Sequence, residues 1–223
     1  MNRRTFLKQG ALGLGAAVIL PACAKETVLS DINACVVSPV ETEGPFPLKT
    51  PEKFVRSNII GDRVGVSLEV VIKIENVSQE CQPLAGMFVD IWHCDAQGNY
   101  SEYKRQLAGD FSDQHFLRGR QVTDETGSVS FQSIYPGWYP GRAPHIHIAV
   151  LNNKGESVLI TQMAFPEAAS KAVYATPAYN GDFDTPNDED GEFEDSLNWN
   201  LANTLTGNTK DGYSVTEVIK VAG

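Results

Sequence analysis

Hydrophobic and polar residues alternate over several short stretches of the chain. In the clearest of these, Val64 to Glu75, every second residue is aliphatic and the residues between are mostly polar. A period of two places the aliphatic residues on one face of a β-strand, so we expect one buried and one solvated face here. Met87 to Cys94 is apolar on both faces and is expected in the centre of a sheet. Four further strands are expected at Ser128 to Ile134, His145 to Leu151, Ser157 to Met163 and Tyr213 to Val221.

Turn-forming residues separate these stretches. The segment Asn152-Asn-Lys-Gly155 joins two expected strands as a hairpin connection. Residues 42–47 hold two prolines and a glycine and cannot form regular structure. Only Pro166 to Val173 has a helical pattern. Short strands between Gly- and Pro-rich turns predict an all-β sandwich or barrel with little helix, in one domain over residues 33–223.

The first 24 residues have the layout of an export signal. Basic residues precede an apolar run at 11–20, which is too short for a membrane span of about 20 residues. Arg3-Arg4-Thr-Phe-Leu-Lys8 resembles the twin-arginine type of signal, which predicts an exported protein, periplasmic or associated with the cell envelope. Leu20-Pro-Ala-Cys23 is similar to a lipoprotein cleavage box, and ordinary cleavage nearby is the alternative to acylation of Cys23. A helix packed on the domain is the alternative to a signal.

The charge balance excludes some classes of partner. The chain has 18 basic and 28 acidic residues and a formal net charge of -10. Removal of residues 1–22 takes away three basic residues and no acidic one, so the charge of the exported chain would be -13. Such a chain has no general attraction for nucleic acid or for an anionic membrane. A lipid on Cys23 would therefore be its link to a membrane.

Three cysteines follow Cys23, namely Cys35, Cys81 and Cys94. An oxidising compartment allows one disulfide among them. Turn-like residues beside Cys35 and Cys81 favour that pair. The other two pairings, and three buried thiols that act as small apolar residues, stay open.

An acidic segment at 182–195 contains eight aspartates and glutamates. The spacing does not fit a calcium loop, because with Gly191 as the turn glycine the first and twelfth positions would be Pro186 and Leu197. We therefore predict a solvated acidic loop.

The strand at His145 to Leu151 begins with two histidines in alternate positions. His145 and His147 therefore share one face, an arrangement that suits two ligands of one metal but also occurs at surfaces and in cores. A turn rich in proline and glycine precedes them and would hold Tyr139 and Arg142 nearby. A phenol with a pKa of about 10 is a poor zinc ligand, whereas a hard trivalent ion such as Fe(III) makes its ionisation favourable. Tyr139 thus indicates ferric iron, with a structural corner tyrosine as the alternative.

Two segments resemble the ferric site of the intradiol ring-cleavage dioxygenases, the catechol and protocatechuate 3,4-dioxygenase family. One extends from Pro136 to His147 and the other from Val89 to Tyr100. Shorter matches follow in the family order at residues 42–45, 116–119 and 123–127, so the resemblance covers roughly residues 40–195. The chain lacks the long helical N-terminal part of the catechol 1,2-dioxygenases. That departure leaves the substrate more open than the chemistry.

The resemblance implies a ligand set and a reaction. Tyr100, Tyr139, His145 and His147 match the four protein ligands of a non-haem Fe(III), and Arg142 matches the active-site arginine. The family cleaves a catechol-type ring between its two hydroxylated carbons with O2, and both oxygen atoms enter a cis,cis-muconate-type diacid. In the family the second tyrosine, here Tyr139, leaves the iron and takes up a substrate proton. Arg142 would stabilise negative charge that develops on the ring.

The resemblance also implies a fold, an antiparallel β-sandwich of the prealbumin or transthyretin type with Greek-key connections and long active-site loops. A transthyretin-like binding module without turnover is the alternative function, and a copper or zinc protein is another. The oligomeric state stays open, a homo-oligomer included. The negative charge favours a neutral catechol over an anionic one.

The remaining histidines and two tryptophans are expected outside the ligand set. We expect His93 in the core or behind the ligands, and His115 at the surface or in the lining of a pocket. Trp92 is expected in the core, and Trp138 in the wall of an aromatic pocket.

Overall fold

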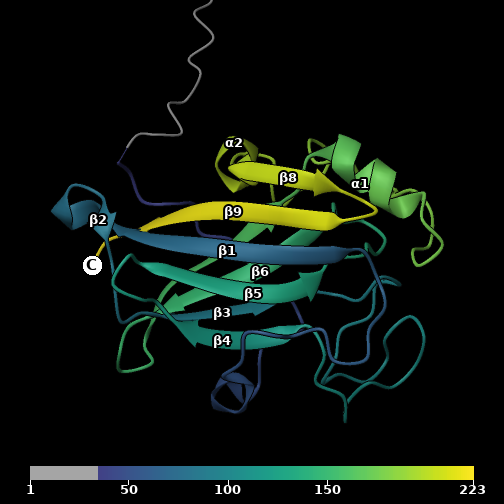
Figure 1. The fold of residues 1–223 in the computed structure, drawn as a ribbon, viewed down its shortest axis with the longest axis horizontal. Helices are drawn as coiled ribbons and strands as arrows, with labels where there is room; N and C mark the ends of the chain where they lie inside the picture. The colour runs from purple at the N-terminus through teal and green to yellow at the C-terminus, as the bar shows by residue number, and fades with distance from the viewer. Residues whose placement is uncertain (1–34) are drawn as a thin grey trace, which may run out of the picture. The chain divides into compact units, whose positions relative to one another are not determined.

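Alternating side chains build two β-sheets that pack face to face. A computed structural model of the chain describes residues 35–223, so the predicted export signal and Cys23 lie outside the described residues. One sheet contains β1 (Ser67–Asn76), β2 (Gln82–Pro83), β5 (Ser128–Ile134), β8 (Thr204–Asn208) and β9 (Gly212–Val221) (Figure 1). The other contains β3 (Phe88–Trp92), β4 (Arg118–Val122), β6 (His145–Leu151) and β7 (Ser157–Ala164). The predicted β-sandwich is confirmed.

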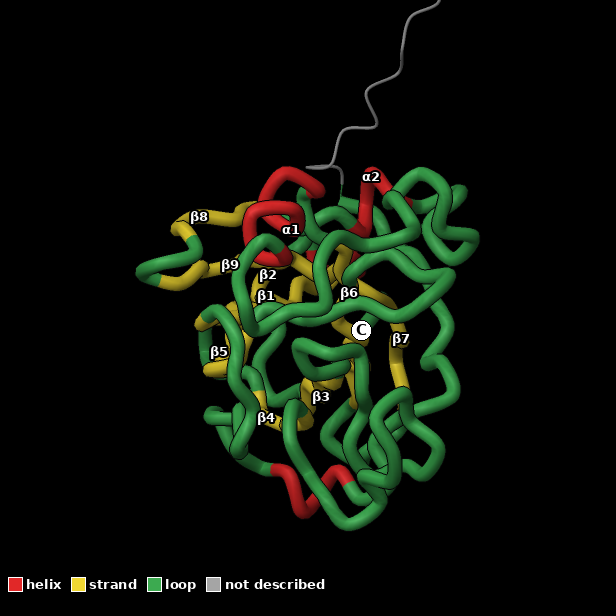
Figure 2. Tube along the Cα trace, turned by 90° about the vertical axis from the view of Figure 1, so that its right-hand side faces the viewer, coloured by secondary structure: helices red, strands yellow, loops and turns green. Residues whose placement is uncertain are grey.

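Helices contribute little to this fold. They are α1 (Glu167–Tyr174), α2 (Leu197–Asn200) and two short 3-10 helices at Pro51–Phe54 and Val77–Gln79. Figure 2 shows that most of the chain outside the strands is loop. No helix within residues 35–223 is long and apolar enough to cross a lipid bilayer.

The strand order places the first strand, β1, beside the last strand, β9. The larger sheet has the order β2-β1-β9-β8, with β5 also paired to β1, and the smaller sheet has the order β4-β3-β6-β7. β3 is central, as its apolar pattern predicts. The pair β1–β9 is parallel, in contrast to the antiparallel pairs around it, so the larger sheet is mixed.

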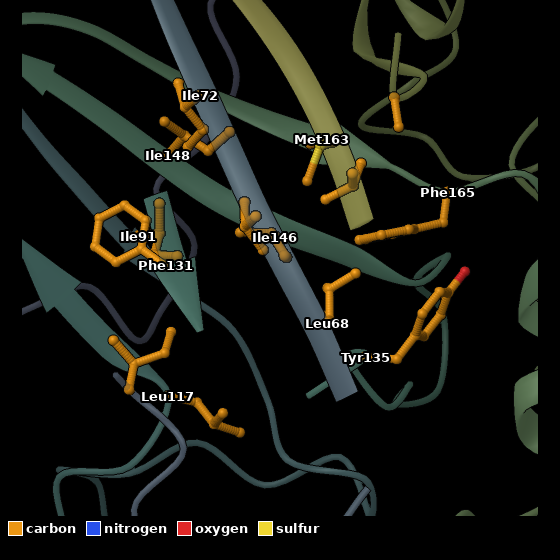
Figure 3. Packing of buried hydrophobic residues seen from close by; sticks show 14 of the residues in the cluster. Leu68, Ile72, Ile91, Leu117, Phe131, Tyr135, Ile146, Ile148, Met163 and Phe165 are labelled. Atoms are coloured by element: carbon orange, nitrogen blue, oxygen red, sulfur yellow. The ribbon is translucent and has the colours of Figure 1, made fainter. Parts of the chain in front are cut away.

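The core lies between the two sheets. Leu68 and Ile72 of β1 face Ile146 and Ile148 of β6, with Phe131 of β5 beside them, and each of these side chains is at most 1% exposed. Figure 3 shows these residues pointing toward one another between the layers. Because side chains alternate along a strand, the even-numbered residues of β6 fill the core and the odd-numbered ones project from the opposite face.

The expected elements agree with the structure except at some strand ends. Ser128–Ile134 and His145–Leu151 have the predicted bounds, and α1 is displaced by one residue. The first strand begins at Ser67 and not at Val64, whose side chain is 75% exposed. The chain bends there because the amide of Val66 donates to the Tyr179 hydroxyl, at 3.0 Å, and not to a neighbouring strand. The strands β2, β4 and β8 were not predicted.

A disulfide fixes the start of the described chain. Cys35 and Cys81 are bonded, so the favoured pairing is confirmed, and Cys94 is a buried free thiol. Beyond Cys35 the chain crosses the outer face of the smaller sheet. The amide of Glu41 donates to the carbonyl of Ile160 in β7, at 2.9 Å, and the amide of Arg56 donates to the carbonyl of Arg120 in β4, at 3.2 Å. Residues 41–56 thus form a cover over this face.

Candidate metal centre

The outer face of the smaller sheet carries a row of four residues in register. Arg118 of β4 pairs with Trp92 of β3, Trp92 with His147 of β6, and His147 with Gln162 of β7. Directly paired residues of an antiparallel sheet project to the same side. All four are buried, although they face away from the sandwich core, because the cover at residues 41–56 and other loops lie over them.

His145 and His147 project from this face with their ring tips together. Their Nε2 atoms are 3.1 Å apart, and the side chains are 3% and 2% exposed. The indole of Trp92 stacks on the ring of His147, with centroids 5.0 Å apart and an angle of 3° between planes. A Cβ at Gly44 would lie 3.1 Å from Cε1 of His147, so a larger residue would crowd that ring. The histidine is held between the indole and the backbone of the cover.

Tyr100 reaches the histidines from the turn that follows β3. Asp95 organises this turn, because its Oδ1 accepts from the amides of Gln97 and Asn99, at 3.0 and 2.9 Å. Gly98 has a φ of +85°, in the left-handed region that favours glycine. The result is a buried Tyr100 whose hydroxyl is 3.4 Å from Nε2 of His145.

Tyr139 comes from the turn before β6. Its hydroxyl is 3.2 Å from Nε2 of His145. The two tyrosine turns interlock, since a Cβ at Gly137 would lie 2.2 Å from the carbonyl oxygen of Asp95, and a Cβ at Gly98 would lie 2.4 Å from that of Trp138. The structure therefore brings together all four predicted ligands, Tyr100, Tyr139, His145 and His147.

Burial keeps these four side chains neutral. It lowers the pKa of His145 to about 3, with the charge of Arg142 adding to the effect, and lowers the pKa of His147 well below its ordinary value. Burial also raises the pKa of Tyr139 to about 12, against the opposing influence of Arg142, and raises that of Tyr100 well above 10. Nδ1 of His145 donates to the carbonyl of Ala143, at 2.6 Å, so its Nε2 carries the lone pair that faces the tyrosines.

The geometry and the chemistry of these donors fit one metal ion. Two atoms that each lie about 2 Å from an ion are at most about 4 Å apart, and Nε2 of His145 lies 3.1–3.4 Å from the other three donor atoms. Within residues 35–223 no three His, Cys, Asp or Glu side chains gather where they could hold an ion. The hydroxyl oxygens of Tyr100 and Tyr139, at 3.4 and 3.2 Å from Nε2 of His145, are the donors that the structure places beside the histidine pair. Ionisation of buried phenols requires a strong Lewis acid, which favours a ferric ion over zinc.

Arg142 lies in the turn that carries Tyr139, and its amide donates to the Tyr139 carbonyl, at 3.3 Å. Its guanidinium binds Asp190 and Gln162. Asp190 is fully buried, so the prediction of a solvated acidic loop is wrong at this position, although six of the eight acidic residues of the segment are exposed. The exception arises because one acidic residue pairs with a partly buried cation.

His93, His115 and Trp92 lie as expected. His93 is a core residue with Nε2 2.7 Å from the hydroxyl of Ser133, and burial lowers its pKa to about 4. The side chain of His115 is 56% exposed. Trp92 is buried as predicted, and it also contacts the site. Trp138 is partly buried and donates from Nε1 to the carbonyl of Gly181, at 2.9 Å.

The sequence reasoning missed several residues around the site, namely Gln162, Asp190, Arg118 and Gly44. Gln162 had a usable signal, because it is a polar residue in an apolar strand and the predicted hairpin at Asn152-Asn-Lys-Gly155 places it near His147. Asp190 had none, since seven other acidic residues share its segment.

Comparisons with known proteins identify the family to which the chain is similar. The profile of a family described as "Dioxygenase" matches residues 46–178. Chlorocatechol 1,2-dioxygenase of Rhodococcus opacus is 35% identical over 102 residues, which are 37% of this chain and 38% of that protein. Catechol 1,2-dioxygenase of Candida albicans is 28% identical over 156 residues, 59% of this chain and 49% of that protein. The chain thus spans less than half the length of these two relatives.

A solved structure matches over a larger share of both chains. It is an intradiol ring-cleavage dioxygenase from Tetranychus urticae, with 32% identity and a TM-score of 0.74, and the match covers 84% of this chain and 95% of that one. Both the family profile and this structure cover more than half of the chain. The chain belongs to the intradiol ring-cleavage dioxygenase family.

Proposed function

We propose that the protein is a non-haem Fe(III) dioxygenase that cleaves a catechol-type ring between its two hydroxylated carbons. The product would be a cis,cis-muconate-type diacid that contains both atoms of O2. One observation carries the proposal. The hydroxyl oxygens of two tyrosines and Nε2 of His147, all from buried or partly buried side chains, lie 3.1–3.4 Å from Nε2 of His145.

Tyr100, Tyr139, His145 and His147 would hold the iron. When bound, Fe(III) would supply a Lewis acid that favours ionised phenols and draws electron density from a coordinated catecholate. Tyr100 is 1% exposed, whereas Tyr139 is only partly buried. This asymmetry supports Tyr139 as the residue that accepts a proton from a substrate hydroxyl. Arg142, in the same turn, would stabilise negative charge as it develops on the ring.

The charges near the site support a neutral catechol as substrate. Glu41 and Glu43 flank Thr42, whose carbonyl accepts from Gln162 at 2.8 Å, and they precede Gly44, which lies over His147. The charge of Arg142 is already paired with Asp190. A carboxylate on the ring would add negative charge beside these acidic residues, and Arg142 already has one carboxylate partner, so we expect catechol to be cleaved with a higher kcat/KM than protocatechuate.

The decisive experiment supplies iron during expression and measures metal content, colour and oxygen uptake. Tyrosinate on Fe(III) gives a red-brown colour, so the pure protein should be coloured, contain about one iron per chain and consume O2 with catechol. A colourless protein without iron and without oxygen uptake would sink the proposal. Catechol binding to an iron-loaded protein without oxygen uptake would indicate a binding module.

Three variants assign the roles. Tyr139→Phe and His147→Ala should each weaken or abolish iron binding and cleavage, because each removes a donor atom. Arg142→Ala should keep the iron and the colour but lose most of the turnover. Lys73→Ala, an exposed change on β1, is the control and should match the wild type. Full colour and activity in either donor variant would remove that residue from the ligand set.

A further inference from the structure

Asp190 is a buried carboxylate in a segment of otherwise mostly exposed acidic residues. It is 0% exposed, whereas Asp188 and Glu189 immediately before it are exposed. A carboxylate is expensive to bury unless charged and hydrogen-bonding groups satisfy its oxygens. Three groups do so here, from Arg142, Ala143 and Glu192. Two of these three belong to the turn that leads into the histidine strand.

The first contact fixes the direction of the Arg142 side chain. Nε of Arg142 is 2.9 Å from both carboxylate oxygens of Asp190. From the other side, a terminal guanidinium nitrogen donates to Oε1 of Gln162, at 2.6 Å. The Gln162 amide is itself oriented, because its Nε2 donates to the carbonyl of Thr42, at 2.8 Å. A charge-assisted contact on one edge and an oriented amide on the other leave the guanidinium little freedom.

The second contact reaches a histidine through one peptide unit. Oδ2 of Asp190 accepts from the amide of Ala143, at 2.7 Å. The carbonyl of the same residue accepts from Nδ1 of His145, at 2.6 Å. This bond places the proton on Nδ1 and leaves Nε2 free to act as a donor atom. Asp190 therefore holds the backbone residue that sets the orientation and the tautomer of His145.

We propose that Asp190 is a positioning residue of this site. One carboxylate aims Arg142 and, through the Ala143 peptide, fixes His145, although it lies 48 residues beyond Arg142 in the sequence. The proposal rests on the proposed ring cleavage. It gives one member of the acidic segment a task that its exposed neighbours do not share.

Two substitutions separate the two contacts. Asp190→Asn keeps the size and one acceptor oxygen, which can still receive the Ala143 amide, but it removes the charge that holds Arg142. We expect kcat for catechol to fall at least tenfold with iron content and colour unchanged. Asp190→Ala removes both contacts, and we expect it also to lose iron faster to a chelator. Asp188→Asn makes the same chemical change at an exposed neighbour and should equal the wild type in both measurements.

A double-variant cycle shows whether Asp190 acts through Arg142. In the Arg142→Ala background, Asp190→Asn should cause no further loss of kcat. The cycle is repeated on thermal unfolding of the metal-free protein, where Arg142→Ala alone leaves Asp190 without its cation. There Asp190→Asn should raise the melting temperature of Arg142→Ala, although it lowers that of the wild type.

The outcomes distinguish this proposal from the proposed function. A kcat of Asp190→Asn equal to that of Asp188→Asn, or losses that multiply in the double variant, would overturn the Arg142 contact as the working link. Equal iron retention in Asp190→Ala and Asp190→Asn would overturn the His145 link. A wild type without iron and oxygen uptake would refute the ring cleavage, and the melting temperatures of the metal-free variants would still decide whether Asp190 and Arg142 are coupled.

Discussion

Replacing Gly137 with alanine tests whether the two tyrosine-bearing turns must stay in contact. Gly137 precedes Tyr139 by two residues, and its Cα faces the backbone of the turn that carries Tyr100. An added Cβ would lie 2.2 Å from the carbonyl oxygen of Asp95 and 2.8 Å from the carbonyl carbon of Ala96. Both are backbone atoms, so no side chain can rotate away to relieve the overlap.

The size of the perturbation follows from these distances. Contacts of a real Cβ below 3.0 Å essentially do not occur, so the turns must separate by about 0.8 Å, from 2.2 to 3.0 Å. Overpacking of this kind costs about 1–3 kcal/mol of stability. The larger effect should be on the site, because a misplacement near 1 Å can reduce turnover by about 100-fold. Gly137→Ala should therefore fold, bind iron more weakly and lose most of its kcat.

The assay compares Gly137→Ala with Gly191→Ala. An alanine Cβ at Gly191 meets nothing within 4 Å, so this control changes the same residue type without a clash. Urea unfolding gives the stability, metal analysis and tyrosinate colour give the iron, and oxygen uptake gives kcat. If Gly137→Ala kept the iron content and kcat of Gly191→Ala, the contact between the turns would not position Tyr100 and Tyr139.

Three further predictions concern the body of the domain. Replacing both Cys35 and Cys81 with serine should lower the free energy of unfolding by about 4 kcal/mol, the chain-entropy value for a bridge across 46 residues. A reductant should lower the free energy of unfolding of the wild type by the same amount and leave that of the variant unchanged. Burial raises the pKa of Glu217 well above its ordinary 4.5, so the folded chain binds this proton more tightly than the unfolded chain and stability falls as pH rises above 4.5. Glu217→Gln should remove this loss of unfolding free energy, which is at most about 1.4 kcal/mol per pH unit. If the urea-derived stabilities of the wild type and the variant changed in parallel from pH 4 to 8, the prediction would be wrong. Trp92→Ala should lower the free energy of unfolding by about 3–5 kcal/mol. Trp92→Phe should lower it much less, because phenylalanine keeps a ring against His147 and removes an indole N–H that is buried without a partner. Equal urea midpoints for the two variants would show that the ring does not support the histidine.

The strands that alternation made predictable are those with an aliphatic inner face. Ser128–Ile134 and His145–Leu151 were predicted with their observed bounds, since Phe131, Ile146 and Ile148 mark the face that enters the core. The strand pattern and the turn before it indicate His145, His147 and Tyr139 as candidate ligands, whereas Tyr100 enters the set only through the resemblance, and neither argument gives distances. Tyr100 and His145 are 45 residues apart and meet because β3 pairs with β6 and the turn that follows β3 packs against the turn that precedes β6.

Strand β4 shows why other elements could not be predicted. Two arginines in five residues indicate an exposed polar segment. In the structure, however, Arg118 and Arg120 lie on a buried face of the strand. The structure satisfies Arg118 with Ser101 and the carbonyl of Phe46, and Arg120 with Asp90. Gly119 fills the inner face, where a Cβ would lie 2.5 Å from a methyl group of Ile59. These partners lie far away in the sequence, so no local pattern predicts them.

Because the site lies on the outer face of a sheet, the residues that stabilise the fold and the residues that would contact a substrate are largely different. The side chains that stabilise the sandwich lie between the sheets, whereas those that would meet a substrate lie beneath residues 41–56 and the acidic segment. Substitutions in the two groups should therefore combine additively, because they share few contacts. A library confined to the exposed side chains of the cover, such as Thr42, Glu43 and Lys49, could change which rings are accepted at little cost in folding. The donor atoms on the outer face of the smaller sheet would stay in place while the exposed side chains of the cover change.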